Sequence, residues 1–344
     1  METETEKEKY KSLRIMRSKK GKGFQYTDRK TKKKIRNKKI LERITKLVLP
    51  PAYPKVYISD NPDNRVQAVG VDDKGRDQYF YHQNAILERK ENKFNGLIDF
   101  IKKIPKIRAD MFRVIMSCKP RETGFSKKEI TCIVLFLMDR CNFRVGCQKY
   151  KELYESFGAT TLMPQHLEIK PKSIMINFKG KKGVENKAEV THPKVIELLK
   201  HLIKNTPKNQ YLFSYHQNPQ DIREYERAGT HTICEKHINQ YLKSYHPNIS
   251  CKMYRTYSAN HECIKKLNNL TMEETASRRK RAVLQVLRDI AEKHHHTAAV
   301  SRSSYLHDGI ITQYLEDPQR WKNDYKKYGN NQPDKYLKYM IHKK

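Results

Sequence analysis

Residues 167–190 read LEIKPKSIMINFKGKKGVENKAEV, a β-rich stretch in an otherwise helical part of the chain. Within it, residues 167–169, 174–178 and 188–190 are short runs typical of strands. The turn Gly180-Lys181-Lys182-Gly183 separates the last two runs and predicts a β-hairpin. We therefore expect a mainly helical domain that carries one β-hairpin.

Apolar residues recur at helical spacing on both sides of this stretch. The expected helices are residues 94–104, 109–116, 127–141, 193–205, 234–245 and 281–292. Together with the hairpin they predict one large domain over residues 88–320. Residues 321–344, rich in Lys, Tyr and Asn, are expected to be a C-terminal extension, either a helix or a surface tail.

A smaller domain is expected over residues 19–87. Its predicted elements are a helix at 38–47, which Leu49-Pro50-Pro51 ends, strands at 56–58, 66–69 and 78–81, and the turn Asp72-Asp73-Lys74-Gly75. Glycine and aromatic residues at 21–26, before a basic turn at 29–34, indicate a further hairpin, with a solvated basic tail as the alternative. Residues 1–18 lack apolar periodicity and are expected to be a mobile tail. The predicted fold class is α+β, with a small β-rich N-terminal domain and a larger mainly helical one.

The charge of the chain predicts its partner. Lys and Arg number 71 against 38 Asp and Glu, which gives a formal net charge of +33. Such an excess favours a polyanion, and duplex DNA is the natural one. The seven cysteines form no C-x-x-C pair, and no apolar run is long enough to span a bilayer. We expect no disulfide, no zinc, no membrane association, and a soluble intracellular or virion-borne protein.

Two basic residues could act on a phosphate. Arg144, in Phe143-Arg144-Val145-Gly146, follows an apolar helix and can present its planar fork to an anion, although a helix-capping Arg is the simpler interpretation. Lys181 lies in the glycine-flanked turn and can donate a proton to a leaving alkoxide, although solvated turn lysines are commoner.

Further along the chain, Arg255 lies in Lys252-Met253-Tyr254-Arg255-Thr256-Tyr257, with a surface Arg as its alternative. Three consecutive histidines end at His296, and Tyr305 follows nine residues later. We expect no metal there, because adjacent residues point in different directions and no carboxylate or Cys has ligand spacing.

The chain resembles the type IB DNA topoisomerases of the poxvirus and bacterial kind in the order of its motifs, which are R-V-G, G-K-K-G, K-x-x-R-T-Y, H-T and S-x-S-S-Y. Its composition, rich in Lys, Asn and Ile, favours a giant virus as the source. The N-terminal segments GKGFQY at 21–26, LERI at 41–44, LPPAY at 49–53 and GRDQYFYH at 75–82 are similar to that family's signature. The resemblance covers about residues 20–310.

The resemblance implies a clamp around DNA and a catalytic set of Arg144, Lys181, Arg255, His296 and the nucleophile Tyr305. It implies relaxation of positive and negative supercoils through a 3′-phosphotyrosyl intermediate, without ATP, metal or other cofactor, by a monomer. The protein would act in an intracellular, DNA-containing compartment, and if viral in the virion or the virus factory of the host cell. The DNA-binding residues that it implies are Arg76, Gln78, Tyr79, Tyr81, Lys149, Tyr150 and Lys252.

The chain departs from the family pattern at two positions. His295 stands where the family usually has Gly, so His295 is an alternative to His296, although the nine-residue spacing to Tyr305 favours His296. Lys182 stands where many members have Asp, so Lys182 is a rival general acid. Two other functions remain as alternatives. A tyrosine recombinase uses similar residues, but generally has a His where this chain has Lys252, and a non-catalytic basic DNA-packaging protein would explain the charge alone.

Overall fold

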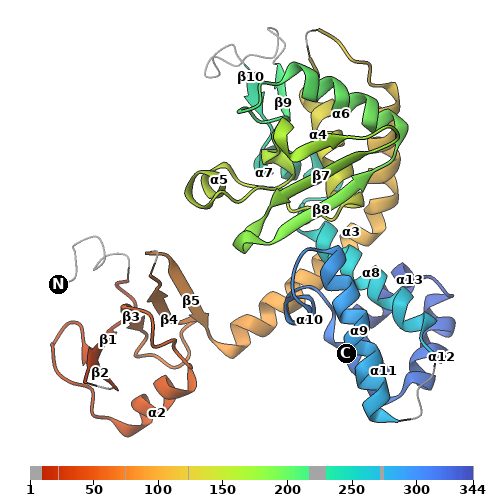
Figure 1. Ribbon diagram of the computed structural model, residues 1–344. Helices are drawn as coiled ribbons and strands as arrows, with labels where there is room; N and C mark the ends of the chain where they lie inside the picture. Colours follow the sequence, from red (N-terminus) through yellow and green to blue (C-terminus); the bar gives the residue numbers. More distant parts are fainter. Residues whose placement is uncertain are drawn as a thin grey trace. The chain divides into compact units, whose positions relative to one another are not determined.

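The computed structural model describes residues 10–21, 23–73, 75–122, 124–216, 230–271 and 275–343. The chain divides into two compact units, residues 1–93 and 94–344 (Figure 1). The first is built on a β-sheet and the second is mainly helical, which confirms the predicted α+β class. Lys22, Lys74 and residues 1–9 of the predicted tail lie outside the described residues.

In its described residues, the first unit contains a five-stranded antiparallel sheet in the order β2-β1-β3-β4-β5 and a short helix before α3 begins. Its elements are β1 (Ile15–Lys20), β2 (Gly23–Asp28), α2 (Lys38–Lys46), β3 (Lys55–Ile58), β4 (Val66–Val71) and β5 (Asp77–Tyr81). The predicted helix and strands are all present. A hairpin is present too, but β2 pairs with β1, which precedes it, and the basic residues 29–34 follow β2 instead of joining the two strands of the hairpin. The alternative of a solvated basic tail at 21–26 is therefore wrong.

The expectation of a mobile tail up to residue 18 differs from the structure over residues 10–18. Ile15 and Arg17 lie in β1 and are buried, and Tyr10 and Leu13 are buried as well. The Tyr10 ring stacks on Tyr57 with centroids 4.2 Å apart. Tyr10, Leu13 and Ile15 stand among Lys, Arg and Ser residues, and an Arg occupies the buried position 17, so the segment shows no regular alternation of apolar and polar residues that would predict a strand.

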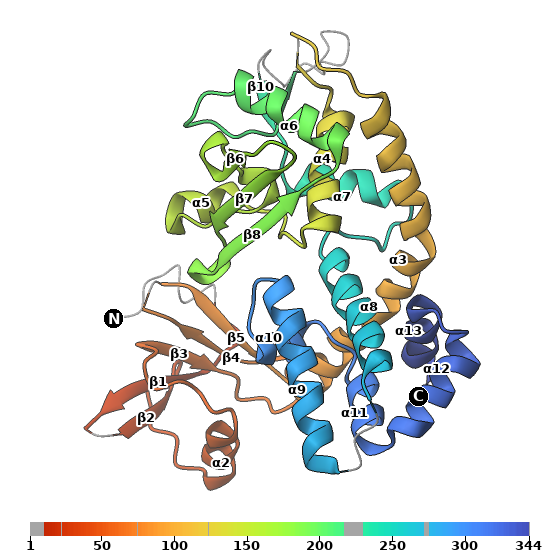
Figure 2. The ribbon, with the colours of Figure 1, turned by 45° about the vertical axis from the view of Figure 1, so that its right-hand side comes forward.

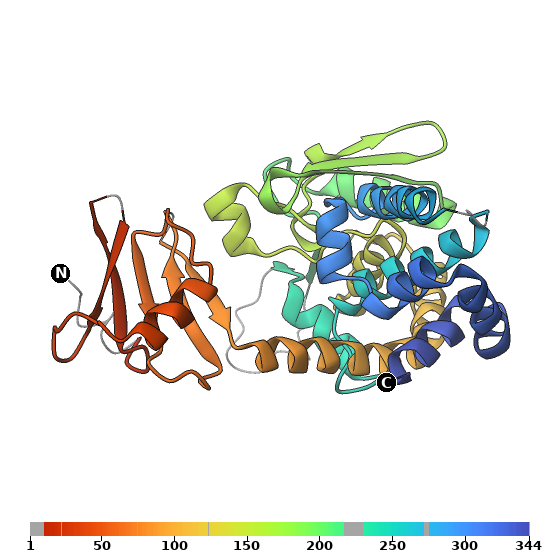
Figure 3. The same ribbon diagram turned by 90° about the horizontal axis from the view of Figure 1, so that it is seen from below.

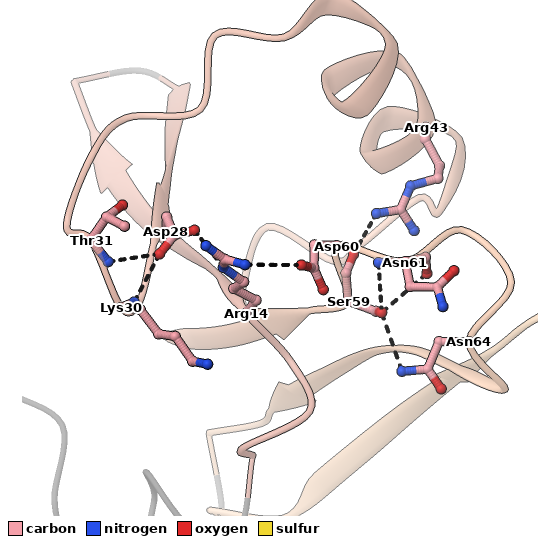
Figure 4. Close-up of polar contacts among 9 residues, drawn as sticks. All are labelled: Arg14, Asp28, Lys30, Thr31, Arg43, Ser59, Asp60, Asn61 and Asn64. Carbon is pink, nitrogen blue, oxygen red and sulfur yellow. Dashed lines mark hydrogen bonds and ion pairs between the residues drawn. The ribbon is translucent and has the colours of Figure 1, made fainter.

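Polar contacts hold the loops of this unit (Figure 4). Asp28 accepts hydrogen bonds from the backbone N–H of Lys30 and Thr31 and pairs with Arg14 at 2.7 Å, which closes the turn after β2. Arg43 of α2 donates to the backbone carbonyl of Ser59, and so ties the helix to the loop after β3. The basic turn is thus attached to an ordered sheet.

The second unit is mainly helical and carries a three-stranded antiparallel sheet, β6-β7-β8, at one side (Figure 2). Its strands are β6 (Leu167–Ile169), β7 (Ile174–Lys179), β8 (Glu185–Val190), β9 (Ser214–His216) and β10 (Thr230–Thr232). Its helices are α4 (Lys127–Arg140), α5 (Gln148–Tyr154), α6 (Pro193–Asn205), α7 (Glu235–Lys243), α8 (Met253–Asn269), α9 (Ala276–Lys293), α10 (Ala298–Ser304), α11 (Asp308–Glu316), α12 (Pro318–Gly329) and α13 (Pro333–His342), while α3 (Gln83–Ser117) begins in the first unit. None of the helices in the described ranges is long and apolar enough to cross a membrane.

The core of this unit forms around α4, whose residues from Ile130 to Met138 are all buried. Ser126 and Glu129 form a capping box that fixes the start of α4. The predicted hairpin and most predicted helices are confirmed. The two helices expected at 94–104 and 109–116 are one helix, because buried Ile101, Ile104 and Ile107 on either side of Pro105 keep the segment packed.

The C-terminal residues 321–344 are expected from the sequence to be either a helix or a surface tail, and the structure shows helices there. These helices contribute buried residues to the core of the second unit. Helices α12 and α13, dark blue in Figure 3, pack against each other. Trp321 is fully buried and donates its indole N–H to the Ile310 carbonyl at 3.1 Å. Asp334 of α13 accepts a hydrogen bond from Tyr257 of α8 at 3.0 Å. The last two helices therefore support α8.

Candidate active site

Arg144 lies in a tightly held loop that follows α4. The Arg144 carbonyl accepts the N–H of Ala159 at 2.8 Å, and the next carbonyl, of Val145, accepts that of Thr160 at 2.7 Å. Gly146 has a φ of 95°, and a Cβ added to Gly158 would lie 2.6 Å from its backbone. The two backbone segments can approach this closely only because neither glycine has a side chain. The loop therefore has little conformational freedom, and the Arg144 backbone is fixed.

Arg255, on α8, is a buried cation with 4% of its surface exposed. Its guanidinium donates to the backbone carbonyls of Asn142 and His294. Burial lowers its pKa to about 10, and the nearby charge of Arg144 adds to the shift. Arg255 therefore joins the Arg144 loop to the end of α9, and its charge is poorly solvated before any anion binds.

His296 and Tyr305 are brought together by a turn and a short helix. Helix α9 ends at Lys293, the chain turns at the three histidines, and Thr297 caps α10 by accepting the N–H of Val300. Tyr305 follows α10 directly. The rings of His296 and Tyr305 are stacked, with centroids 4.9 Å apart and planes 4° apart. In Figure 2, α10 lies beside α9.

The Tyr305 hydroxyl accepts a hydrogen bond from the guanidinium of Arg144 at 2.8 Å. The Arg255 guanidinium carbon lies 5.3 Å from the centre of the same ring. Burial raises the pKa of the Tyr305 hydroxyl, but Arg255 and Arg144 together outweigh burial and hold it below its usual value. The two cations therefore favour negative charge on the hydroxyl and create a site for an anion next to it.

The His296 imidazole faces this site in its neutral form. Burial and then the charge of Arg255 lower its pKa to about 4. Its Nδ1 lies 3.2 Å from the Ser301 hydroxyl, while its Nε2 is buried with no hydrogen-bond partner among the described residues. A buried, unpaired ring nitrogen beside Tyr305 is available to a ligand oxygen.

Asn260 is a site residue that our interpretation of the sequence missed. Its side chain is fully buried and donates to the Tyr305 carbonyl at 2.8 Å, while its oxygen accepts the N–H of His307 at 2.8 Å. It therefore fixes the backbone on both sides of residue 306. Its only signal in the sequence is an amide on the helix that carries Arg255, five residues further along.

The two candidate lysines are not part of this cluster. Lys181 and Lys182 are exposed in the turn between β7 and β8, and Lys182 has a left-handed φ of 64°. Among the described residues, no hydrogen bond or ion pair joins either lysine to Tyr305. A cleft of 760 Å³ lies between the hairpin and the end of α9, and its lining includes Glu185 of β8 and His296.

The predicted DNA-binding residues of the first unit lie in and beside β5. Arg76 forms an ion pair with Asp72 at 2.8 Å, and Gln78 donates to the same carboxylate at 3.1 Å. The rings of Tyr79 and Tyr81 are stacked 6.1 Å apart, as expected for alternate residues of a strand, and Tyr79 is 48% exposed. This surface offers aromatic and amide groups.

The predicted DNA-binding residues of the second unit are also exposed. Lys149 and Tyr150 lie on α5, close after the Arg144 loop in the chain. Lys252 immediately precedes α8, one helical turn before Arg255, and forms an ion pair with Glu235 at 3.4 Å. Within the described ranges, no group of three His, Cys, Asp or Glu side chains could hold a metal ion.

The chain matches two family models. Residues 82–332 match the catalytic core of eukaryotic DNA topoisomerase I, and residues 23–72 match the N-terminal domain of bacterial DNA topoisomerase IB. These two matches cover the predicted catalytic and N-terminal segments, and so support the topoisomerase interpretation over the recombinase and DNA-packaging alternatives.

Curated viral proteins are similar over most of the chain. DNA topoisomerase 1B of Acanthamoeba polyphaga mimivirus is 30% identical over 323 residues, which is 92% of this chain and 93% of that protein. DNA topoisomerase I of monkeypox virus and DNA topoisomerase 1B of vaccinia virus (strain Copenhagen) are each 26% identical over 252 residues, 72% of either chain. The predicted resemblance is confirmed, and the chain belongs to the type IB DNA topoisomerase family.

Proposed function

We propose that Tyr305 is the nucleophile with which this topoisomerase cleaves one strand of duplex DNA and later reseals it. The observation that carries this assignment is the hydrogen bond of 2.8 Å from Arg144 to the Tyr305 hydroxyl, made beside the buried Arg255 and the stacked His296. The Tyr305 hydroxyl gives its proton to water and its oxygen attacks the phosphorus, the bond to the 5′ oxygen breaks, and the protein is left joined to the 3′ phosphate.

Arg144, Arg255 and His296 stabilise the transition state of this transfer. In-line attack places additional negative charge on the two nonbridging oxygens. Two guanidinium groups and one imidazole N–H, already oriented in a partly dry site, can bind those oxygens without reorganisation. The lowered pKa of the Tyr305 hydroxyl has the same cause, since both arginines favour an anion at this place.

The leaving 5′ oxygen requires a proton, and we assign its donation to Lys181. A positioned general acid contributes about 10²–10⁴-fold in rate. Lys181 lies in an exposed turn, from which a long side chain can reach bound DNA, and Lys182 remains its rival. In religation the 5′ hydroxyl returns its proton to the lysine and attacks the phosphotyrosine, the bond to Tyr305 breaks, and the Tyr305 oxygen takes up a proton from water.

Relaxation follows because the bond energy is kept in the phosphotyrosine while the broken strand rotates. The reaction therefore needs no ATP, and the charges of the chain's own residues take the place of a metal. Supercoils of both signs relax, since rotation follows whichever torque is present.

We further propose that a monomer closes around duplex DNA as a clamp, with Arg76, Gln78, Tyr79 and Tyr81 on one unit and Lys149, Tyr150 and Lys252 on the other in contact with it. The net charge of +33 supports binding mainly through phosphates. Affinity should then fall steeply between about 50 and 200 mM salt, and nearly salt-independent binding contradicts the clamp. The protein would act where DNA is found in the cell, including a virus factory or a virion.

The first test uses plasmids of negative and positive supercoiling, in EDTA and without ATP, with wild type and Tyr305→Phe. We expect wild type to relax both and to leave a covalent adduct at the 3′ phosphate after an SDS trap. The variant should bind DNA and do neither. Relaxation by the variant at the wild-type rate refutes Tyr305 as the nucleophile.

A second test assigns the general acid. Lys181→Ala and Lys182→Ala are compared on DNA with an ordinary scissile 5′ oxygen and on DNA with sulfur in its place, because a thiolate leaves readily without a proton. We expect Lys181→Ala to cleave the ordinary DNA slowly and the sulfur-containing DNA at the wild-type rate. The same pattern for Lys182→Ala alone transfers the role to Lys182.

A further inference from the structure

His295 has a backbone conformation that its side chain disfavours. Its φ is 53°, in the left-handed region where residues other than Gly are strained. Its N–H donates to the Glu292 carbonyl at 3.0 Å, and the next N–H, of His296, donates to the Ala291 carbonyl at 2.9 Å. These two bonds form the Schellman motif that ends α9, in which Gly is the usual residue at this position.

The His295 side chain makes contacts that a Gly cannot. Its ring lies tilted against that of Phe143, with centroids 5.8 Å apart. Phe143 is fully buried and directly precedes Arg144. The ring therefore links the turn before His296 to the loop before Arg144.

This link joins two segments that no covalent connection holds together near the site. Arg255 bridges the same two segments from the other side, through the carbonyls of Asn142 and His294. His296 and Arg144 both contact Tyr305, so a shift of the turn against the loop would change the positions of both groups around the reacting phosphate.

On the basis of the function proposed above, we propose that His295 is a positioning residue that holds His296 and Arg144 in register for transition-state binding. It does not touch the phosphate. A misplacement of about 1 Å can slow a reaction about 100-fold. Loss of the His295 ring should therefore reduce the single-turnover cleavage rate constant by about 10- to 100-fold and leave noncovalent DNA affinity unchanged.

Two variants separate the ring from the backbone strain. His295→Gly removes the ring and relieves the strain of the left-handed backbone, whereas His295→Ala removes the ring but retains that backbone strain. We expect both to lose cleavage to the same extent at saturating DNA, and His295→Ala alone to show a lowered thermal midpoint. Asn330→Gly, the same kind of exchange at the left-handed residue that ends α12, is the matched control and should cleave at the wild-type rate.

A double-mutant cycle tests whether His295 acts through its neighbour. In a His296→Ala protein, adding His295→Gly should reduce the cleavage rate by a clearly smaller factor than it does in wild type, because one of the two groups that His295 positions is already absent. The inference is overturned if His295→Gly cleaves at the wild-type rate, or if it lowers the cleavage rate by the same factor in wild type and in the His296→Ala protein. In either case cleavage by wild type leaves the proposed function intact. Absence of cleavage by wild type overturns both.

Discussion

Replacing Asn260 by Ala should weaken both the fold and the catalytic step. The Asn260 side chain supplies the partner of the Tyr305 carbonyl and of the His307 N–H. A buried backbone group that loses its partner costs about 1–3 kcal/mol, so at about 1.5 kcal/mol for each group the loss of both contacts should destabilise the protein by about 3 kcal/mol. Thr256 also accepts a bond from this amide, at 2.7 Å, but its carbonyl keeps the ordinary helical partner.

The expected loss of stability corresponds to a fall in the thermal midpoint of roughly 6–12 °C for a unit of this size. Because the Tyr305 backbone would no longer be fixed, single-turnover cleavage should fall as well, by about 10-fold or more at a temperature where the variant is folded. The assays are calorimetry and rapid-quench cleavage of a DNA duplex at saturating protein. Asn269→Ala, at the exposed end of the same helix, is the control for both.

Asn260→Asp gives a sharper test because the shape of the side chain is kept. Its carboxylate can still accept the His307 N–H but cannot donate to the two carbonyls, and as an acid it can donate only when protonated. The cleavage rate relative to wild type at the same pH should therefore rise as the pH falls. If Asn260→Ala melts and cleaves like wild type, the described role of Asn260 in holding Tyr305 is wrong.

Three further outcomes can be measured. Arg255→Lys should cleave almost as slowly as Arg255→Ala, about 100-fold below wild type in single turnover, because one ammonium cannot replace a fork that spans two carbonyls. Burial lowers the pKa of His294 to about 3 in the folded protein, so between about pH 6.5 and pH 3 the unfolded chain binds more protons than the folded one. The free energy of unfolding should therefore fall by up to about 1.4 kcal/mol per pH unit as the pH drops towards 3. Urea titrations should find this slope flatter in His294→Gln. Asp334→Asn should lose about 1–2 kcal/mol in urea titrations, because it weakens the contacts of α13 with Tyr257 and His261 at 3.0 and 2.7 Å.

Short-range sequence patterns were sufficient to predict the helices and hairpins whose formation depends mainly on neighbouring residues. The β7 and β8 hairpin follows from short strand-forming runs on either side of a glycine-flanked turn, and α4 follows from apolar residues at helical spacing. The candidate residues Arg144, Arg255, His296 and Tyr305 lie together in the structure, although they are far apart in the chain. Their order and spacing could be recognised only because they resemble a known family.

Long-range packing explains what the sequence did not predict. The segment from Tyr10 to Ile15 is ordered by the sheet that it joins, and α3 passes through Pro105 because its apolar face is buried. The role of Asn260 depends on a residue 45 positions away. The left-handed backbone at His295 also explains why Gly is usual at that position in the family, and no local pattern distinguishes it from its neighbours.

The close contact between Gly146 and Gly158 limits how this chain can diverge during evolution. A side chain at either position would meet the other backbone, and both positions already hold the smallest residue. No second substitution at one position can therefore compensate for a change at the other. We expect both glycines to be invariant among functional descendants, so that statistical covariation would give no sign of the contact that shapes the Arg144 loop.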